Sequence, residues 1–175
     1  MARWRFEPGH TAAEFCVRHM MVTDVRGHLK NIEGFLEFDP EKPQEAYTEA
    51  KVYAQNLCTH EEERDAHLRS DHFLDTQNHP LIEFRSTKVI LTGKYQYKVM
   101  GDLTIRGVTR TVTLAVRFNG KVHSPFDDYR IGFYAETVFN RHDFGVSWDA
   151  ETLDGGKVVG DDVYITIDAE AILER

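Results

Sequence analysis

Cysteine, long apolar runs and an apolar leader are all scarce or missing in this chain. Cys16 and Cys58 are its only cysteines, too few and too widely separated to indicate a disulfide framework or a zinc site, so we expect two reduced thiols. No apolar run is long enough to predict a membrane span. Residues 1–4 lead directly into charged sequence, which indicates no signal peptide and predicts a cytoplasmic protein.

Positive charge is also in deficit. Lysine and arginine together number 21 against 29 acidic residues, which gives a formal net charge of −8. Nucleic acids and anionic membranes require a concentrated basic patch, so neither is expected as the principal partner. The 11 Phe, 7 Tyr and 2 Trp residues fit a β-rich protein. A chain of 175 residues is long enough for one domain with a sizeable core, and we expect a single domain over residues 1–175.

Apolar and polar residues alternate most clearly in residues 95–118. If Gly107 and Val108 form a two-residue type II′ turn, Leu103 lies opposite Val112 in an antiparallel hairpin. Apolar side chains then share one face of both strands, and polar side chains share the other. This stretch therefore predicts two paired strands with one buried face.

A second two-residue turn, at Thr92 and Gly93, adds the preceding strand to this hairpin. That strand then places Ile90 on the same apolar face. Gly101 lies beside Phe84 in this arrangement, where it either makes room for the aromatic ring or marks a bend in the sheet. We favour the bend.

The remaining extended segments also alternate and are separated by turn residues. They are residues 3–6 with 12–18 as one strand interrupted at Pro8-Gly9, then 25–38, 46–57, 131–139 and 161–171.

The alternation stops at one place, which predicts the only helix, near residues 60–69. Thr59 and Glu62 have the spacing of a capping box, and acidic residues in the first turn suit the positive end of a helix. We expect Arg64 and Asp65 to form an ion pair that fixes the helix to the sheet.

About eight amphipathic strands without a second helical layer must bury one face against each other. We therefore predict an all-β fold, an eight-stranded antiparallel up-and-down barrel. A barrel of this size is either filled by side chains or holds one small ligand. Small residues on the inward faces favour unfilled space, although they equally allow bulky neighbours to interdigitate. They are Ala50, Ala54, Gly101, Ala135, Thr137 and Ala169.

Short motifs along nearly the whole chain point to a known family. They are GHT (9–11), FCVRHM (15–20), VRG (25–27), ERDAHLRS (63–70), FRST (84–87), GDLTIRGVT (101–109), and DFG (143–145) after Arg141. With these motifs the chain resembles the YceI-like, or polyisoprenoid-binding, family. The resemblance implies a lipocalin-like barrel that holds a polyprenyl, isoprenoid quinone or similar long lipid for carriage or storage, often as a homodimer. We expect no cofactor. Many members of that family are exported, whereas this sequence shows no signal peptide.

Inward positions and basic residues supply the candidate ligand contacts. Each buried CH₂ group contributes roughly 0.8 kcal/mol, so apolar lining should dominate the affinity. A polar headgroup would need donors at the barrel mouth. The candidate lining residues are Phe15, Val17, Ile32, Leu36, Ile82, Phe84, Val99, Gly101, Leu114, Val116, Phe133 and Ile165. The candidate headgroup residues are His10, Arg18, His19, Arg26 and Arg141. Both sets have an ordinary structural alternative, as plain core and as partners of the surplus acids.

Catalytic and metal-binding patterns are weak. The histidines around the predicted helix have no HExxH spacing, so we expect no metal centre; they are His60, His67, His72 and His79. No G-x-S-x-G elbow is present, and Cys16 has no recognisable catalytic partner. We therefore expect a non-enzymatic lipid-binding protein. Two alternatives stay open: an enzyme acting on a lipid in the barrel, for which Lys88 is the one candidate titratable group, and a cavity-free protein-interaction module.

Overall fold

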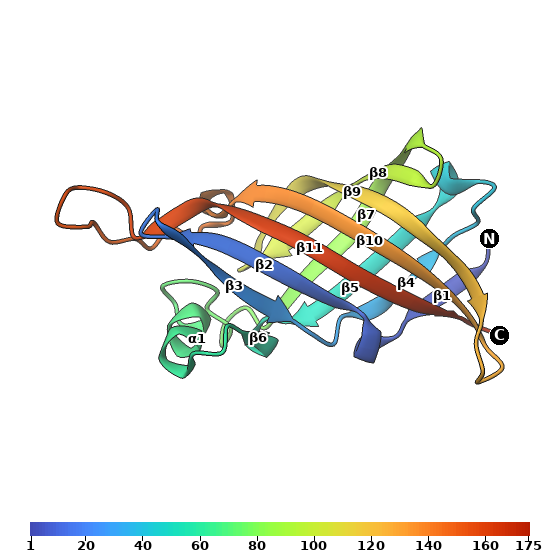
Figure 1. Cartoon of the computed structure of the whole chain (residues 1–175), viewed down its shortest axis with the longest axis horizontal. Coiled ribbons are helices and arrows are strands. Elements are labelled where there is room, and N and C mark those ends of the chain that lie inside the picture. The colour runs from blue at the N-terminus through green and yellow to red at the C-terminus, as the bar shows by residue number, and fades with distance from the viewer.

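One continuous antiparallel sheet forms the wall of a barrel in the computed structural model, which describes residues 1–175. The strand order is β1-β4-β5-β7-β8-β9-β10-β11-β2-β3-β6, and a further pairing of β1 with β11 closes the ring (Figure 1). The strands are β1 (Arg3–Phe6), β2 (Ala12–His19), β3 (Thr23–Leu29), β4 (Glu33–Glu37), β5 (Tyr47–Tyr53), β6 (Leu57–Cys58), β7 (Leu81–Gly93), β8 (Gln96–Ile105), β9 (Val108–His123), β10 (Tyr129–Asn140) and β11 (Val159–Leu173). The helical elements are α1 (Glu62–Arg69) and the 3-10 turns η1 (Pro8–His10), η2 (Pro43–Glu45), η3 (Ala54–Asn56) and η4 (Arg141–Phe144). None of them is long and apolar enough to cross a membrane.

These eleven strands make eight long strands, because three of the long strands are interrupted. β1 and β2 both pair with β11, so they form one long strand broken at η1, as predicted. β3 and β4 form the next, and β5 and β6 the third. Each long strand pairs with its neighbour in sequence, and the first pairs with the last. The predicted eight-stranded up-and-down barrel is therefore confirmed.

The segment predicted as one run over residues 25–38 is divided. β3 ends at Leu29 and β4 starts at Glu33, and between them Asn31 has a φ of 61°. Asparagine tolerates this left-handed conformation better than most residues. The break lets β3 pair with β2 while β4 pairs with β1.

The β8–β9 hairpin turns one residue earlier than predicted. Arg106 and Gly107 occupy the turn, with φ values of 51° and 70°. Two positive φ angles define a type I′ turn, rather than the type II′ turn expected from glycine alone. Leu103 consequently lies opposite Arg110, not Val112. Because the pairing shifts by two residues, each side chain keeps its predicted face.

The β7–β8 hairpin differs more. The turn predicted at Thr92–Gly93 lies instead at Lys94–Tyr95. The register also shifts at Thr87, where β7 carries one extra residue. Such a bulge exchanges the inward and outward positions beyond it. Val89 therefore faces the interior, and Ile90, predicted on the apolar face, is 38% exposed.

Gly101 is explained by close packing of an aromatic ring. A Cβ atom at this position would lie 2.4 Å from Cζ of Phe84 and 2.6 Å from the carbonyl oxygen of Arg85. The bend that we favoured is therefore not needed, because room for the ring already requires glycine. Gly101 pairs with Ser86 and Val112.

Helix α1 is present where predicted, but its N-cap is different. The carboxylate of Glu61 caps the helix by accepting hydrogen bonds from the backbone N–H groups of Glu63 and Arg64. The predicted cap, Thr59, instead donates its N–H (2.9 Å) and its hydroxyl (2.5 Å) to Asp65. Arg64 donates to the hydroxyl and carbonyl oxygens of Thr59 at 2.7 and 2.8 Å. The two charged residues therefore fix α1 to the end of β6 through Thr59, not through the expected ion pair.

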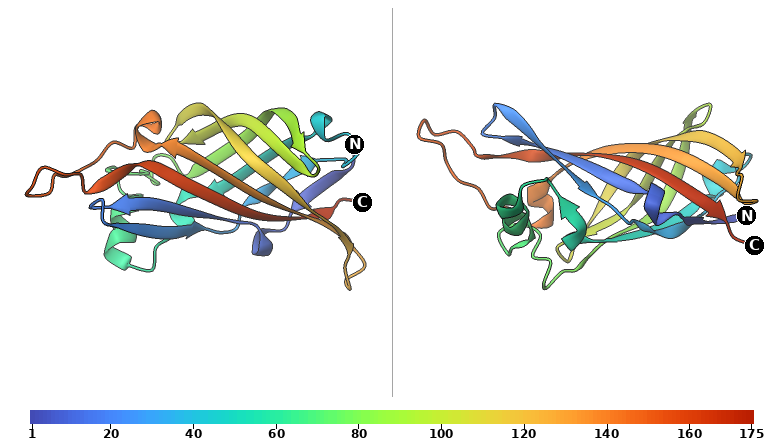
Figure 2. Two further views of the ribbon diagram at one scale, coloured as in Figure 1. Left: turned by 45° about the horizontal axis from the view of Figure 1, so that its top comes forward. Right: turned by 60° about the horizontal axis from the view of Figure 1, so that its bottom comes forward.

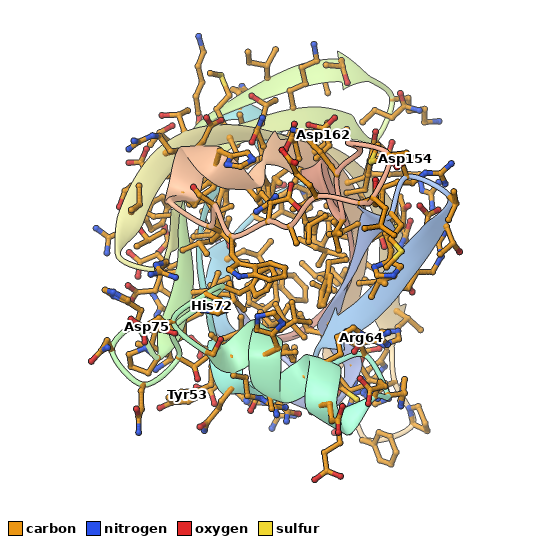
Figure 3. The ribbon with its side chains drawn as sticks, turned by 90° about the vertical axis from the view of Figure 1, so that its left-hand side faces the viewer. Tyr53, Arg64, His72, Asp75, Asp154 and Asp162 are labelled. Atoms are coloured by element: carbon orange, nitrogen blue, oxygen red, sulfur yellow. The ribbon has the colours of Figure 1, made fainter.

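The two ends of the barrel are built differently (Figures 1 and 2). Both termini lie at one end, the termini end. α1 and the long connection between η4 and β11 lie at the other, the α1 end (Figure 3). A cluster of side chains packs the termini end, and all but Phe38 lie on strands: Trp4, Phe6, Leu36, Phe38, Tyr97, Ile131, Phe133 and Ala171. The cluster at the α1 end combines Ile105 and Val112, on β8 and β9, with Phe73, Phe144 and Val146, which lie outside the strands.

Candidate lipid-binding cavity

The inward faces of the strands surround a cavity of about 250 Å³. Of its 33 lining residues, 26 are hydrophobic. This volume is close to the lower limit of ordinary ligand pockets, about 300 Å³. The barrel interior is therefore not filled by its own side chains, which contradicts the cavity-free alternative.

Most of the predicted lining residues lie along this cavity. All but Ile32, which immediately precedes β4, lie on the inward faces of β4, β7, β8, β9, β10 and β11, as expected for strands with one buried face. Contact with a ligand stays a prediction for each of them. They are Ile32, Leu36, Ile82, Phe84, Val99, Leu114, Val116, Phe133 and Ile165.

Three predicted lining residues lie elsewhere. Phe15 points at Gly27, where a Cβ atom would lie 2.4 Å from the ring, and the methyl group of Thr59 lies on the same glycine. Val17 lies further along β2, between Val25 of β3 and Val163 of β11, and does not line the cavity. Gly101 lies under the ring of Phe84 and does not reach the cavity itself.

The sequence reasoning missed further lining residues of two kinds. Some lie on predicted inward faces and could have been found from alternation alone: Tyr97, Leu103, Val112, Ile167 and Ala169. Others, Pro43 and Ala46, belong to the β4–β5 loop. Nothing in the local pattern shows that this loop folds over the interior, because the contact depends on where β5 and β7 separate.

Three of the five basic residues predicted to bind a headgroup lie together on the β2–β3 hairpin, the other two lie elsewhere, and none of the five lines the cavity. On the β2–β3 hairpin, Arg18 donates to Asp24 at 3.1 Å and Arg26 donates to Glu14 at 3.4 Å. His19 ends β2 on the same hairpin. These arginine contacts match the alternative in which basic groups pair with the surplus acids.

Arg141 has a structural role at the α1 end. It is only 3% exposed and donates to the carbonyl oxygens of Gly160 (2.9 Å), Val146 (2.8 Å) and Trp148 (2.7 Å). Burial lowers the pKa of its guanidinium, and the nearby carboxylate of Asp149, at 3.5 Å, acts in the opposite direction. Arg141 thus holds the connection from η4 to β11 against the barrel.

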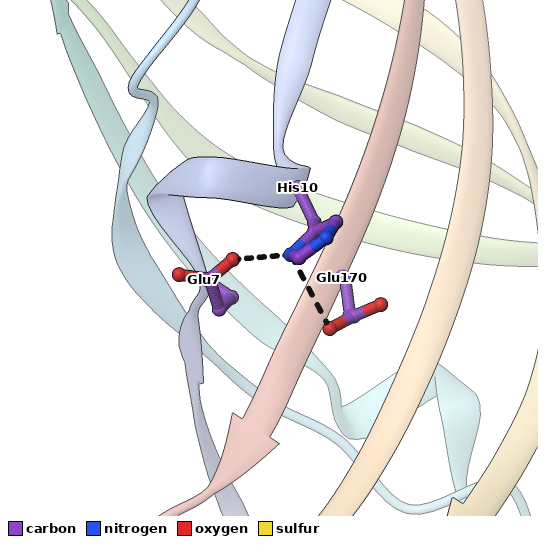
Figure 4. Close-up of side chains that lie close together, drawn as sticks. All are labelled: Glu7, His10 and Glu170. Carbon is purple, nitrogen blue, oxygen red and sulfur yellow. Dashed lines mark hydrogen bonds and ion pairs between the residues drawn. The ribbon is translucent and has the colours of Figure 1, made fainter.

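His10 lies outside the barrel wall, between two carboxylates (Figure 4). Its Nδ1 atom is 2.5 Å from Glu7 Oε2 and 3.9 Å from Glu170 Oε1. One imidazole and two carboxylates are possible metal ligands. However, Arg130 already donates to the same Glu170 oxygen at 2.6 Å. The hydrogen bond from His10 lowers the pKa of Glu7. A network of hydrogen bonds and opposite charges therefore accounts for the cluster.

The four histidines near α1 do not form one site. His67 and His72 contact each other, with 2.9 Å between Nε2 and Nδ1, and the ring of His72 stacks on Trp148. His72 lies at the rim of the α1 end (Figure 3). His79 lies near Asp75, at 4.0 Å, and Nδ1 of His60 is 3.7 Å from the thiol of Cys58. Separate local contacts therefore explain these side chains.

Lys88, on which the enzyme alternative depended, is exposed on β7 and does not line the cavity. It follows the extra residue at Thr87, which changes the side to which the strand's residues point. The amine of Lys88 therefore does not lie inside the barrel, where the enzyme alternative required it.

Comparison with known proteins agrees with the fold. The family model for the YceI-like domain matches residues 4–171. The chain belongs to this family. A relative described as a UPF0312 protein, from Pseudomonas syringae pv. syringae, is 34% identical over 146 residues, which cover 83% of this chain and 76% of the relative.

Solved structures share the YceI-like barrel. The Campylobacter jejuni YCEI protein superimposes with a TM-score of 0.75 at 25% identity, covering 90% of each chain. A polyisoprenoid binding domain from Saccharophagus degradans, implicated in plant cell wall breakdown, gives a TM-score of 0.69 at 11% identity, covering 99% of this chain and 100% of that domain. At that identity the second likeness concerns the fold alone.

Proposed function

We propose that this YceI-like protein binds a long-chain isoprenoid or related lipid in its barrel, for carriage or storage, and that it is not an enzyme. The observation that carries the proposal is the cavity of about 250 Å³ with 26 hydrophobic residues among its 33 lining residues. Family membership supports it, as does the name of the Saccharophagus degradans domain.

The size of the cavity limits how much of a lipid tail it can bury. A volume of about 250 Å³ accommodates on the order of ten to twenty groups the size of a water molecule or a methylene. This corresponds to two or three isoprene units, whose burial would supply ~10 kcal/mol before the costs of association are subtracted. Affinity should therefore rise with tail length until the cavity is full.

A series of isoprenoid alcohols tests this proposal. Geraniol, farnesol and geranylgeraniol would be titrated against the purified protein by displacement of a fluorescent lipid, after native mass spectrometry has shown whether a lipid is already bound. We expect affinity to rise at least about tenfold from geraniol to farnesol and then to level off. An affinity that is independent of tail length, or no binding at all, would contradict burial in the cavity.

Two alanines provide matched variants for the same titration. Ala135 lies on the cavity wall, whereas Ala115 is exposed on the outer face of β9. Ala135→Leu should fill part of the cavity and weaken farnesol binding about tenfold, and Ala115→Leu should not change it. Equal effects of the two variants would mean that the ligand binds elsewhere.

A cytoplasmic location and a homodimer are further proposals, based on the sequence and on the family resemblance. Cell fractionation and light scattering of the purified protein test them directly.

A further inference from the structure

Two polar side chains line the cavity next to each other on β5 and β7, Thr48 and Ser86. The neighbouring Lys51 and Glu83 alternate with the inward residues of these strands and are exposed, so their side chains lie on the outer face. Elsewhere on the wall, the hydroxyls of Thr11 and Thr137 donate to backbone carbonyl groups of adjacent strands. An amphiphilic ligand would therefore meet polar groups mainly at β5 and β7.

Ser86 is the buried member of this set, at 5% exposed. Its Oγ atom accepts a hydrogen bond from the backbone N–H of Thr48 at 2.9 Å, and it makes no other side-chain hydrogen bond. The hydroxyl of Thr48, in contrast, already donates to the carbonyl oxygen of Phe35 at 2.8 Å. A serine hydroxyl can donate as well as accept. Ser86 therefore offers the cavity a free hydroxyl donor.

The wall is not a continuous sheet beside Ser86. Backbone pairing of β5 with β7 ends where Glu49 meets Arg85, and beyond that point β7 pairs only with β8. The β4–β5 loop, residues 39–46, covers the gap and lines the cavity through Pro43 and Ala46. The backbone hydrogen bonds of this loop run within the loop itself. The gap is thus closed by packing, without a ladder of backbone hydrogen bonds.

Most charge around the gap is already balanced. Arg85 lies 3.2 Å from Glu49, and Lys51 lies 3.7 Å from Glu33. The hydroxyl of Tyr47 donates to Glu49, and this hydrogen bond raises the pKa of Tyr47. A phosphate or pyrophosphate needs several free cations, which these pairs do not provide.

We propose that the polar end of the lipid lies in this gap between β5 and β7, against the hydroxyl of Ser86, and that it is an uncharged hydroxyl or carbonyl group. The inference rests on the proposed function, since it names the subsite and the class of ligand within the same cavity. An oxygen atom on the ligand would accept a hydrogen bond from the Ser86 hydroxyl, while the tail lies along the apolar wall.

Two ligands with the same carbon skeleton test the assignment. Farnesol carries a hydroxyl, whereas farnesene is a hydrocarbon with one more double bond and no polar group. We expect Ser86→Ala to weaken farnesol binding about 2- to 10-fold and to leave farnesene binding unchanged. Ser86→Thr, which keeps a hydroxyl, should restore farnesol binding. Thr87→Val is the matched control, because Thr87 is exposed beside Ser86, does not line the cavity, and its hydroxyl already donates to the carbonyl oxygen of Met100.

The comparison separates a ligand contact from a structural role. Ser86→Ala also removes the acceptor of the Thr48 N–H group, and a purely structural effect would weaken farnesol and farnesene equally; that result would overturn the assignment. Farnesyl pyrophosphate is the third probe, because Lys42, on the loop that covers the gap, and Lys88, two residues after Ser86 on β7, are both exposed. Tighter binding of farnesyl pyrophosphate than of farnesol, insensitive to Ser86→Ala, would also overturn it. If none of the probes binds, the proposed function itself fails.

Photo-crosslinking gives an answer that does not depend on a substitution. A farnesol analogue with a diazirine beside the hydroxyl would be irradiated with the wild-type protein and the labelled peptides mapped. We expect labels within residues 43–48 or 84–89. Labels confined to the β2–β3 hairpin or to residues 141–148 would place the polar end elsewhere and overturn the proposal.

Discussion

At residue scale, Gly101 shows how one missing side chain shapes the cavity wall. The ring of Phe84, which lines the cavity, occupies the place that a Cβ atom at Gly101 would take. The carbonyl oxygen of Arg85 lies almost as close, so backbone as well as ring would have to shift. Gly101 thereby determines the position of a cavity residue without touching the ligand space.

The contrast between Gly101 and Gly132 makes this role testable. A Cβ atom at Gly132 would meet its nearest neighbour at an ordinary 3.7 Å. Gly101→Ala should destabilise the protein by about 1–3 kcal/mol, whereas Gly132→Ala should be neutral or slightly stabilising, because glycine is costly within a strand. Urea unfolding measures both. Equal stability of the two variants would show that β8 relaxes around the added methyl group.

The pKa of Asp128 predicts a pH-dependent contribution at the β9–β10 turn. Hydrogen bonds from Arg130, at 2.9 and 3.0 Å, and from Ser124 lower this pKa from 3.8 to about 2. Because the folded-state pKa is the lower one, the stabilisation is present above about pH 4 and is lost as the pH falls towards 2.

Asp128→Asn should therefore lower the melting temperature at neutral pH and have little effect near pH 2. Thermal unfolding followed by circular dichroism across this range measures the difference. Asp127→Asn, in which the replaced side chain is 85% exposed, is the control and should show a much smaller pH-dependent change. A constant difference between Asp128→Asn and the wild type at all pH values would rule out this ionisation as the cause.

At element scale, the carboxylate of Asp65 is the buried part of the attachment of helix α1 to the barrel. Asp65 accepts both the N–H and the hydroxyl of Thr59, and both residues are buried. Asp65→Ala would leave that N–H group without a partner, at a cost of about 1–3 kcal/mol. Glu62→Ala, on the exposed side of the same helix, should change stability by no more than about 0.5 kcal/mol.

Hydrogen exchange locates the effect of these helix variants. We expect faster exchange of the amides in residues 59–69 in Asp65→Ala, with the amides of β10 and β11 unchanged. Faster exchange throughout the barrel would mean that the attachment stabilises the whole fold rather than the helix alone.

The elements also show which features the sequence can and cannot predict. Alternation has a fixed period of two, so the inward faces of β8, β9, β10 and β11 follow directly from residue order. Register depends on turn geometry, and the left-handed conformations of Arg106 and Tyr95 carry no strong sequence signal. The extra residue at Thr87 likewise has no strong signal in the sequence. It is the bulge at Thr87, not the composition, that directs Val89 inward.

The candidate site follows the same division. The apolar lining could be predicted because it is a consequence of strand faces, as Leu114 and Val116 illustrate. The polar group at Ser86 could not be predicted as part of the site. Ser86 and the loop around Pro43 lie together only because β5 and β7 separate beside them. Basic residues such as Arg141 were misleading, since a guanidinium that binds backbone carbonyl groups has the same sequence appearance as one that binds a ligand.

At the scale of the whole molecule, closure joins the two ends of the chain. Trp4 pairs with Leu173, and Phe6 pairs with Ala171. β1 therefore cannot complete its pairing until β11 has been synthesised. Roughly 150 residues separate β1 from β11, which takes about ten to thirty seconds of synthesis at 5–20 residues per second. During that time the apolar inner faces cannot be sealed, and contacts this distant in sequence form slowly. The ribosome therefore sets the earliest moment at which the cavity exists, and a lipid can be enclosed as the barrel closes as well as after it.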